Sequence, residues 1–202
     1  MRRAFTLIEV LVVVGIIVIL AAILFPLFSS ARANGYKVHC LANLHQLLQA
    51  TNMYVSDWDR RLVPARVYAG GPDLGKTWCV LLKPYIQDDR LVVCPVDLQP
   101  QLLSNSTDLA HSYGINYDLT FVGGGTQLSW SMSAIPRTAD LILFFDMKSS
   151  AQAMGSSYAA NRVSRLDGRH SARACVGFLD GHAKAQAPKE VDSDHFWNPN
   201  LP

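Results

Sequence analysis

The sequence predicts an α+β protein in which one long N-terminal α-helix packs on a small antiparallel β-sheet domain. An almost wholly apolar run from Phe5 to Phe28 opens the chain, and a helical apolar pattern follows it without a linker. From residue 57 onward the chain consists of short apolar runs separated by turn residues, which are typical of strands. We therefore expect a membrane helix over 5–28, an amphipathic continuation of it over 29–56, and an exported globular domain over 57–202.

The apolar run is long enough to cross a membrane. Its 24 residues make about 36 Å of helix, against about 30 Å for the hydrocarbon core of a bilayer. Arg2 and Arg3 precede the run, which favours a cytoplasmic N-terminus and an exported C-terminal domain. Its one charged residue, Glu9, would cost roughly 2.5–3.5 kcal/mol at the centre of the bilayer. Glu9 therefore requires an explanation.

Two simple interpretations of the run leave Glu9 unexplained. One is a plain membrane anchor. The other is a secretory signal peptide that is cut at the small residues of Ala31-Arg32-Ala33. The apolar part of such a peptide normally has only about 7–15 residues, so the length of this run disfavours the second interpretation.

The second half of the expected helix is amphipathic. Its apolar residues recur at intervals of three, four or seven, and no proline occurs between Pro26 and Pro64. One face should therefore be buried against the exported domain. That face is predicted to hold Val38, Leu41, Leu44, Leu48 and Val55, flanked by Leu47, Met53 and Tyr54.

The first nine residues carry a specific resemblance. The stretch Arg2-Arg3-Ala4-Phe5-Thr6-Leu7-Ile8-Glu9 resembles the type IV prepilin signature, in which a basic leader ends in a small residue, usually Gly. In that family a membrane-embedded peptidase removes the leader on the cytoplasmic side, and the new N-terminal Phe is N-methylated. The resemblance implies a leader of residues 1–4, cleavage between Ala4 and Phe5, and N-methylation of Phe5. Ala4 in place of Gly is a departure that we expect to slow processing.

The same resemblance suggests a task for Glu9, which would become the fifth residue of the processed chain. Cleavage would create an amine on Phe5, one helical turn from the Glu9 carboxylate, and buried charges are tolerated when they are paired. In a bundle of such helices an amine–carboxylate pair would fix the axial register of neighbouring subunits. Gly15 and Pro26 also match positions at which filament-forming pilins interrupt this helix.

Local patterns predict the elements of the exported domain. The apolar stretch Asp140–Met147 is expected to be a central strand, and polar residues Gly155–Arg165 an exposed loop. The other expected features are a short helix over Trp78–Ile86, a β-branched run over Arg90–Cys94 that Pro95 stops, a weakly alternating stretch over His111–Tyr117, and a turn at Gly123–Gly125 before Gln127–Met132.

The strongest short-range signal is a hairpin near the C-terminus. Asp180-Gly181 lies between the strand-like runs Ala174–Leu179 and His182–Ala187, which predicts an antiparallel pair joined by a type I′ turn with positive φ at both residues. Together with His170, this stretch resembles a motif of one family with prepilin leaders: a histidine, nine residues, then Asp-Gly. Further matches to that family are Cys40-Leu41-Ala42-Asn43-Leu44, Tyr54-Val55-Ser56-Asp57 and Cys94-Pro95.

We expect a structural role for this C-terminal motif. An extended chain would place His170 and Asp180 roughly 30 Å apart. Asp180 and Gly181 should therefore form the turn, while His170 anchors the entry to the strand by a hydrogen bond. A calcium site is the rival interpretation, because some major pseudopilins bind calcium in a C-terminal loop, although Asp-rich spacing of that type is not evident here.

Four cysteines, Cys40, Cys79, Cys94 and Cys175, lack C-x-x-C spacing, which disfavours a zinc ribbon or a thioredoxin-type site. In an exported domain they permit two disulfides with three connectivities, and buried thiols are the alternative. His39 and His45 lie near Cys40 on a mixed helix face, where histidines are more often solvated or packed than metal ligands. We therefore expect no metal site.

Composition and motifs disfavour two classes of function. No nucleophile-elbow, H-E-x-x-H or P-loop pattern occurs, so we expect no enzymatic activity. The net charge of +2 comes from Arg2 and Arg3, and without them 16 basic residues balance 16 acidic ones. This balance disfavours a nucleic-acid partner.

These inferences combine into one expected function. The chain is expected to be a type IV pilin-like subunit, specifically a pseudopilin of a type II secretion-like system in the bacterial inner membrane. Its partners would be like and unlike pilin-type subunits in a filament, the prepilin peptidase and an inner-membrane assembly platform, with no cofactor. The alternatives are a surface pilin for adhesion, motility or DNA uptake, and a membrane-anchored exported binding or enzymatic domain.

Overall fold

The computed structural model describes residues 6–67, 75–100, 109–120, 129–148, 159–160, 165–191 and 193–200. The chain divides into two compact units, one up to Gly35 and one from Tyr36 onward. The expected cleavage site at Ala4 and Phe5, the expected turn at Gly123–Gly125 and most of the expected loop 155–165 lie outside the described residues.

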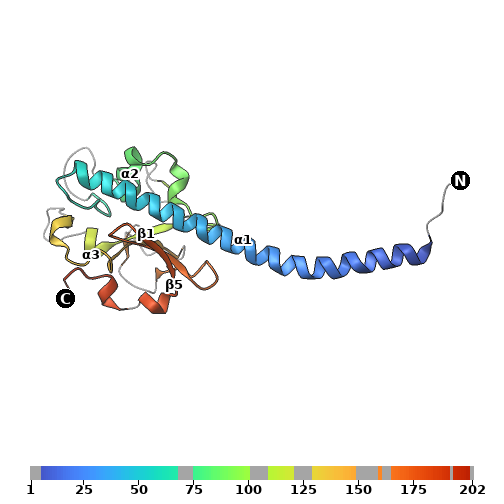
Figure 1. Cartoon of the computed structure of the whole chain (residues 1–202). Helices are drawn as coiled ribbons and strands as arrows, with labels where there is room; N and C mark the ends of the chain where they lie inside the picture. Colours follow the sequence, from blue (N-terminus) through green and yellow to red (C-terminus); the bar gives the residue numbers. More distant parts are fainter. Residues whose placement is uncertain are drawn as a thin grey trace. The chain divides into compact units, whose positions relative to one another are not determined.

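The first unit consists of the N-terminal part of helix α1 (Leu7–Asp57), which is shown in blue in Figure 1. The long helix is present as predicted, and it is continuous through Gly15 and Pro26, the two positions expected to interrupt it. Its most apolar 18-residue window has a mean hydropathy of 3.3, and none of that window is buried. By length and composition this helix is able to cross a membrane.

In the second unit, the C-terminal part of α1 buries one face in the core of the domain. The prediction is confirmed for Leu44, Leu48 and Val55, but it is wrong for Val38, which is 62% exposed; Met53, expected beside the face, is 55% exposed. The buried face continues through polar and small side chains at helical spacing, which a search for large apolar residues passes over. The buried residues of α1 are Cys40, Asn43, Leu44, Leu47, Leu48, Ala50, Thr51, Tyr54 and Val55.

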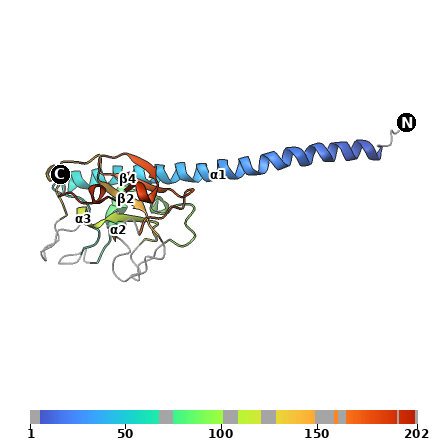
Figure 2. The same cartoon turned by 90° about the horizontal axis from the view of Figure 1, so that it is seen from below.

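The sheet contains four antiparallel strands and one short parallel strand at its edge. The strands are β1 (Tyr113–Asn116), β2 (Ile142–Asp146), β3 (Ala159–Ala160), β4 (Ala174–Phe178) and β5 (Ala183–Gln186). Two of these strands, β2 and β4, are labelled in Figure 2. Their order is β3-β1-β2-β4-β5, and only the pair of β1 and β3 is parallel. Strand β2 is therefore central, as predicted from its apolar sequence.

The central strand separates two apolar clusters because successive side chains of a strand point to opposite faces. Phe144 packs in the larger cluster with Leu44 and Trp78, whereas Phe145 packs in the smaller cluster with Trp197. Burial on both faces explains why every residue of β2 is buried. Strand β4 carries Gly177 where α1 approaches: a Cβ there would lie 3.0 Å from Cδ1 of Leu48, so glycine permits the close packing.

Short helices connect these elements. Helix α2 (Trp78–Leu82) and the 3₁₀ turn η1 (Lys83–Tyr85) confirm the predicted helix over 78–86. The β-branched run before Pro95 is not a strand but the 3₁₀ helix η2 (Asp89–Val92), because the Asp88 side chain caps it by accepting a 2.9 Å bond from the Arg90 N–H. The remaining short helices are α3 (Tyr117–Thr120), η3 (Met132–Ala134), η5 (Pro188–Val191) and η6 (Asp194–Phe196).

The predicted C-terminal hairpin is present, but its turn is of another type. Strands β4 and β5 pair with Gly177 opposite Ala183, and the Gly181 N–H donates to the Phe178 carbonyl at 3.0 Å. Gly181 has a φ of 104°, whereas Asp180 does not have positive φ. The predicted type I′ turn is therefore wrong here. A three-residue loop ending in a left-handed Gly suits a type I turn, which places the positive φ at Gly181 alone.

A second tight turn precedes β4 and was not predicted. The backbone N–H and carbonyl groups of His170 and Arg173 exchange two hydrogen bonds of 3.1 Å, with two residues between them. Those residues, Ser171 and Ala172, have φ values of 54° and 63°. Positive φ at both central residues is the geometry of a type I′ turn, here without glycine or asparagine. This turn fixes the position at which His170 enters the core.

Candidate functional site

The N-terminus of α1 contains the first candidate site, formed by Thr6 and Glu9. The Glu9 carboxylate accepts hydrogen bonds from the Thr6 backbone N–H at 2.8 Å and from the Thr6 hydroxyl at 2.6 Å. The Glu9 N–H in turn faces the Thr6 hydroxyl oxygen at 3.4 Å. This reciprocal arrangement is a capping box, which satisfies backbone donors that a helix start leaves unpaired. In the unprocessed chain Glu9 therefore has a partner within its own helix.

The apolar surface of this helix is the second feature of the N-terminal site. Its large apolar side chains from Leu7 to Phe28 are all more than half exposed in the single chain. A Cβ at Gly15 would meet no described atom within 4 Å, and Pro26 lies inside the helix. An exposed apolar surface of this size requires a membrane or other subunits to cover it.

The C-terminal motif is split between two places. The Asp180 carboxylate accepts a 3.1 Å bond from the His182 N–H and lies 2.6 Å from Nδ1 of the same residue. The Gly181 carbonyl lies 2.8 Å from Nδ1 of His45, which ties the hairpin turn to α1. His170 is instead buried, with its ring against Cys94 and Asp146. Asp180 and Gly181 thus form the turn as predicted, while His170 belongs to a separate site.

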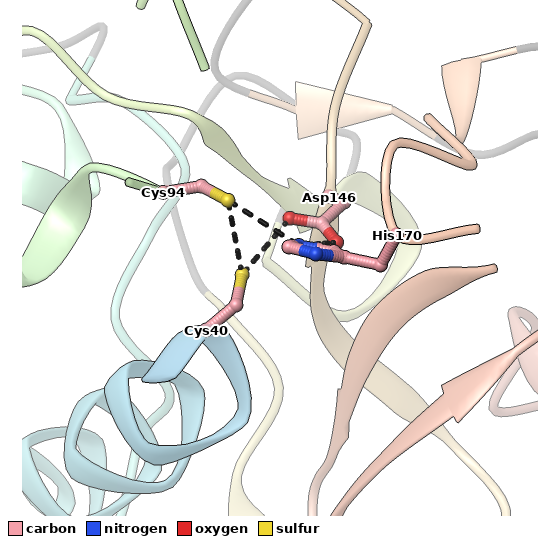
Figure 3. Close-up of side chains that lie close together, drawn as sticks. All are labelled: Cys40, Cys94, Asp146 and His170. Carbon is pink, nitrogen blue, oxygen red and sulfur yellow. Dashed lines mark hydrogen bonds and ion pairs between the residues drawn. The ribbon is translucent and has the colours of Figure 1, made fainter. Parts of the chain in front are cut away.

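That separate site is a ring of four buried side chains (Figure 3). The Sγ atoms of Cys40 and Cys94 are 3.3 Å apart, and Sγ of Cys94 lies 3.3 Å from Nε2 of His170. Nε2 of His170 lies 3.5 Å from Oδ2 of Asp146, and Oδ1 of Asp146 lies 3.4 Å from Sγ of Cys40. All four ligand-type atoms lie within 4.8 Å of one another. We call these four residues the Cys–Asp–His cluster.

Four separate segments supply the Cys–Asp–His cluster. Cys40 lies on the buried face of α1, and Cys94 lies in the extended segment between η2 and Pro95. Asp146 is the last residue of the central strand β2, and His170 directly precedes the type I′ turn before β4. None of the four residues is more than 4% exposed.

Polar neighbours hold the cluster in place. The Cys175 backbone N–H donates to Oδ2 of Asp146 at 2.7 Å, and the Tyr113 hydroxyl lies 3.1 Å from Sγ of Cys40. Arg169 lies next to the cluster in sequence and forms ion pairs with Asp97 at 2.7 Å and with Asp167 at 2.9 Å. Such outer partners fix the rotamers of the inner side chains.

Burial shifts the protonation of the cluster toward neutral forms. Desolvation raises the pKa of Asp146, although the positive charge of Arg169 opposes this. Contact with Cys175 raises the pKa of the Cys40 thiol, and contact with Cys40 raises that of the Cys94 thiol. Burial lowers the pKa of His170, but Cys94 and Asp146 together outweigh this and raise it. Burial therefore disfavours accumulated negative charge in the cluster.

The other candidate residues from the sequence, Cys79, Cys175, His39 and His45, lie outside the Cys–Asp–His cluster. All four cysteines are buried thiols, and Cys40 contacts both Cys94, at 3.3 Å between the sulfurs, and Cys175. Cys79 lies elsewhere in the larger apolar cluster. His45 contacts the hairpin turn, and His39 lines an open groove of about 930 Å³ between α1 and residues 85–95.

Sequence reasoning missed the Cys–Asp–His cluster because its members are far apart in the chain. Cys40 and Cys94 are separated by 54 positions, and Cys94 and His170 by 76. One available signal was Asp146, a carboxylate at the end of an otherwise apolar central strand, because aspartate is rarely buried without a partner.

Comparison with known proteins gives one finding. Residues 1–25 match the family described as the prokaryotic N-terminal methylation motif. No curated protein and no solved structure matched the chain significantly. The matched residues include the expected leader of residues 1–4, Glu9 and most of the apolar part of α1. The match supports a type IV pilin-like prepilin, and the apolar helix fits a membrane-anchored pilin.

Proposed function

We propose that the chain is the precursor of a type IV pilus-like filament subunit. A prepilin peptidase removes residues 1–4 by cutting between Ala4 and Phe5, and the new amine of Phe5 is methylated. The helix from Leu7 to Phe28 holds the subunit in the bacterial inner membrane, with a cytoplasmic N-terminus and an exported domain. The subunit then leaves the bilayer for a filament in which the same helix packs against its copies.

The observation that carries this proposal is the methylation motif over residues 1–25 on a helix with a fully exposed apolar surface. The motif supports the processing steps, and the exposed surface provides a reason for polymerisation. Once the helix leaves the bilayer, only other subunits can cover that surface. The role of the chain is therefore structural, with no turnover of its own.

Glu9 links processing to assembly in this proposal. The capping box occupies the Glu9 carboxylate with Thr6 in the unprocessed chain. Cleavage after Ala4 adds a charged amine on Phe5, one residue before Thr6. This amine pairs with the Glu9 carboxylate of the same subunit or of a neighbour. A neighbour shifted along the filament would leave both charges unpaired in an apolar bundle, which is strongly unfavourable. The pair would therefore fix the register.

Within this class we propose a pseudopilin of a type II secretion-like system. Its partners are like and unlike pilin-type subunits, the prepilin peptidase and an assembly platform in the inner membrane. The balanced charge of the processed chain favours this role over DNA uptake, because a DNA-binding pilin needs a basic surface. The α+β domain would supply the outer surface of the filament.

Filament formation tests the proposal. The chain is co-expressed with a prepilin peptidase and an assembly platform, and sheared filaments are examined by electron microscopy. We expect filaments from the parent and from Ala4→Gly, which restores the usual small residue, and none from Ala4→Leu, which places a large residue at the cut. Short filaments identify a pseudopilin and long surface fibres identify a pilin. Equal assembly of Ala4→Leu would contradict the proposal.

A further inference from the structure

We propose that Cys40, Cys94, Asp146 and His170 bind one Zn²⁺ ion, which joins α1 to the sheet of the exported domain. This inference is independent of the proposed filament. It rests on the geometry of the Cys–Asp–His cluster, on its charge and on the segments that it connects.

The geometry fits a tetrahedral ion. With Zn–S bonds of about 2.3 Å and Zn–N and Zn–O bonds of about 2.0–2.1 Å, neighbouring ligands are about 3.3–3.8 Å apart. The four contacts around the ring measure 3.3, 3.3, 3.5 and 3.4 Å (Figure 3). Asp146 contributes Oδ2 to its contact with His170 and Oδ1 to its contact with Cys40, and the ligand atoms all lie within 4.8 Å of one another, so shifts of about 1 Å would bring them to a regular tetrahedron. The cluster therefore has the size of a zinc site before any ion is bound.

The ligand set selects the ion. Two thiolates, one imidazole and one carboxylate suit Zn²⁺, which takes Cys, His and Asp ligands in closed four-coordinate structural sites. Calcium and magnesium require six or more oxygen ligands or octahedral oxygen geometry, which this cluster does not offer. None of the four ligands is more than 4% exposed, which matches a structural site with no position open to water.

The charge of the site also favours a cation. Two thiolates and a carboxylate would place three negative charges in the core, which is prohibitive without compensation. Zn²⁺ neutralises two of them, and Arg169 adds a positive charge close to Asp146. Binding requires deprotonated ligands, so it releases to the solvent the thiol protons of Cys40 and Cys94 and the proton that burial favours on Asp146. The Cys175 N–H continues to hold Oδ2 of Asp146, as outer partners of metal ligands commonly do.

A Cys40–Cys94 disulfide is the competing arrangement. It would require the sulfurs to approach from 3.3 Å to about 2.0 Å. It would also place the carboxylate of Asp146 and the ring of His170 next to a disulfide, which has no hydrogen to donate to either of them. Zinc instead uses all four side chains.

The ion would connect segments that are distant in the chain. Cys40 is on the helix, Cys94 is in a connecting segment, Asp146 ends the central strand and His170 precedes β4. Because the ligands are buried, the ion must enter during folding, and its binding free energy then contributes to folding. The ion would cross-link the helix to the sheet and resist sliding of one along the other.

Metal content and thiol state test the proposal on the full-length chain. The protein is produced in zinc-supplemented medium, purified in detergent with a tag free of histidine, and analysed by plasma mass spectrometry. Its thiols are alkylated under denaturing conditions with a chelator and without reductant. We expect one zinc per chain and four alkylated cysteines. A chain without zinc, or one in which Cys40 and Cys94 resist alkylation until a reductant is added, overturns the proposal.

Variants locate the ion. Cys40→Ser and Asp146→Asn should lose the zinc equivalent, whereas Cys79→Ser, which changes a buried cysteine outside the cluster, should keep it. Retention of a full equivalent in Cys40→Ser overturns the assignment. Because ligand variants can fail to fold, the parent protein is also prepared with Co²⁺ in place of zinc. Tetrahedral thiolate coordination of Co²⁺ should give intense visible d–d bands and a sulfur-to-metal charge-transfer band. A weak spectrum typical of octahedral Co²⁺ overturns the proposed site.

Discussion

The type I′ turn at Ser171 and Ala172 offers a direct test of the local structure that places His170. Both residues have left-handed φ values, 54° and 63°, which cost an L-residue other than glycine about 1–2 kcal/mol each. Glycine removes this cost at Ala172 but loses about 0.5–1 kcal/mol through the greater freedom of the unfolded chain. We therefore expect Ala172→Gly to stabilise the unit from Tyr36 onward by about 0.5–1 kcal/mol. Ala172 is exposed, so no core packing is lost.

Thermal unfolding of the full-length chain in detergent measures the effect through the near-ultraviolet signal of the buried residues Trp78 and Trp197. For a domain of this size, the expected gain raises Tm by about 1–4 °C. The matched control is Ala185→Gly, on β5, where φ is not positive and glycine should lower Tm instead. A lower Tm for Ala172→Gly, or equal shifts in the two variants, would refute the assignment of the turn.

Two further predictions concern the helix and the sheet. Glu9→Gln keeps an oxygen that can accept the Thr6 N–H bond but removes the charge, so it should preserve the helix start and abolish filament assembly. Glu9→Ala should abolish assembly as well. Sheared filaments are counted by microscopy, and normal assembly of Glu9→Gln would disprove the register role. Gly114→Ala would place a Cβ 2.6 Å from Cζ of Phe145 and should cost about 1–3 kcal/mol in denaturant unfolding. Gly35→Ala, which meets no described atom within 4 Å, is its control and should not destabilise the chain.

The long helix and the central strand were predictable because each depends on a local pattern. An almost wholly apolar run of 24 residues favours a helix that can span a membrane. The apolar composition of Asp140–Met147 favours a strand that is buried on both faces. Both signals are summed over many residues, so single exceptions such as Pro26 do not obscure them. The expected helix and central strand are both confirmed.

The errors arose where one contact overrides a pattern. Arg90–Cys94 has the composition of a strand, but the Asp88 cap turns part of it into a 3₁₀ helix. The Asp-Gly pair indicated a two-residue loop with a type I′ turn. The register of β4 and β5 instead leaves a three-residue loop, and loop length decides the turn type. Val38 fits an apolar spacing, yet it is exposed because the buried face runs through Cys40 and Asn43.

The Cys–Asp–His cluster could not be predicted from spacing because it is assembled by tertiary folding. Its members come from a helix, a connecting segment, a strand end and a turn, and no two of them are near each other in the sequence. Cys40, Cys94 and His170 do lie in segments that carried the resemblance to a family with prepilin leaders. Only the packing of α1 on the sheet shows that these three segments meet at Asp146.

The mass of the protein extracted from membranes tests the central claim most directly. Intact-mass analysis, followed by fragmentation of the N-terminal peptide, determines which residue begins the chain and what it carries. We predict the loss of Met1–Ala4 and one added methyl group on the amine of Phe5 when the prepilin peptidase is present, with the unprocessed chain in its absence. A chain that still begins at Met1 in the presence of the peptidase, or one that begins after Ala33, would contradict the account.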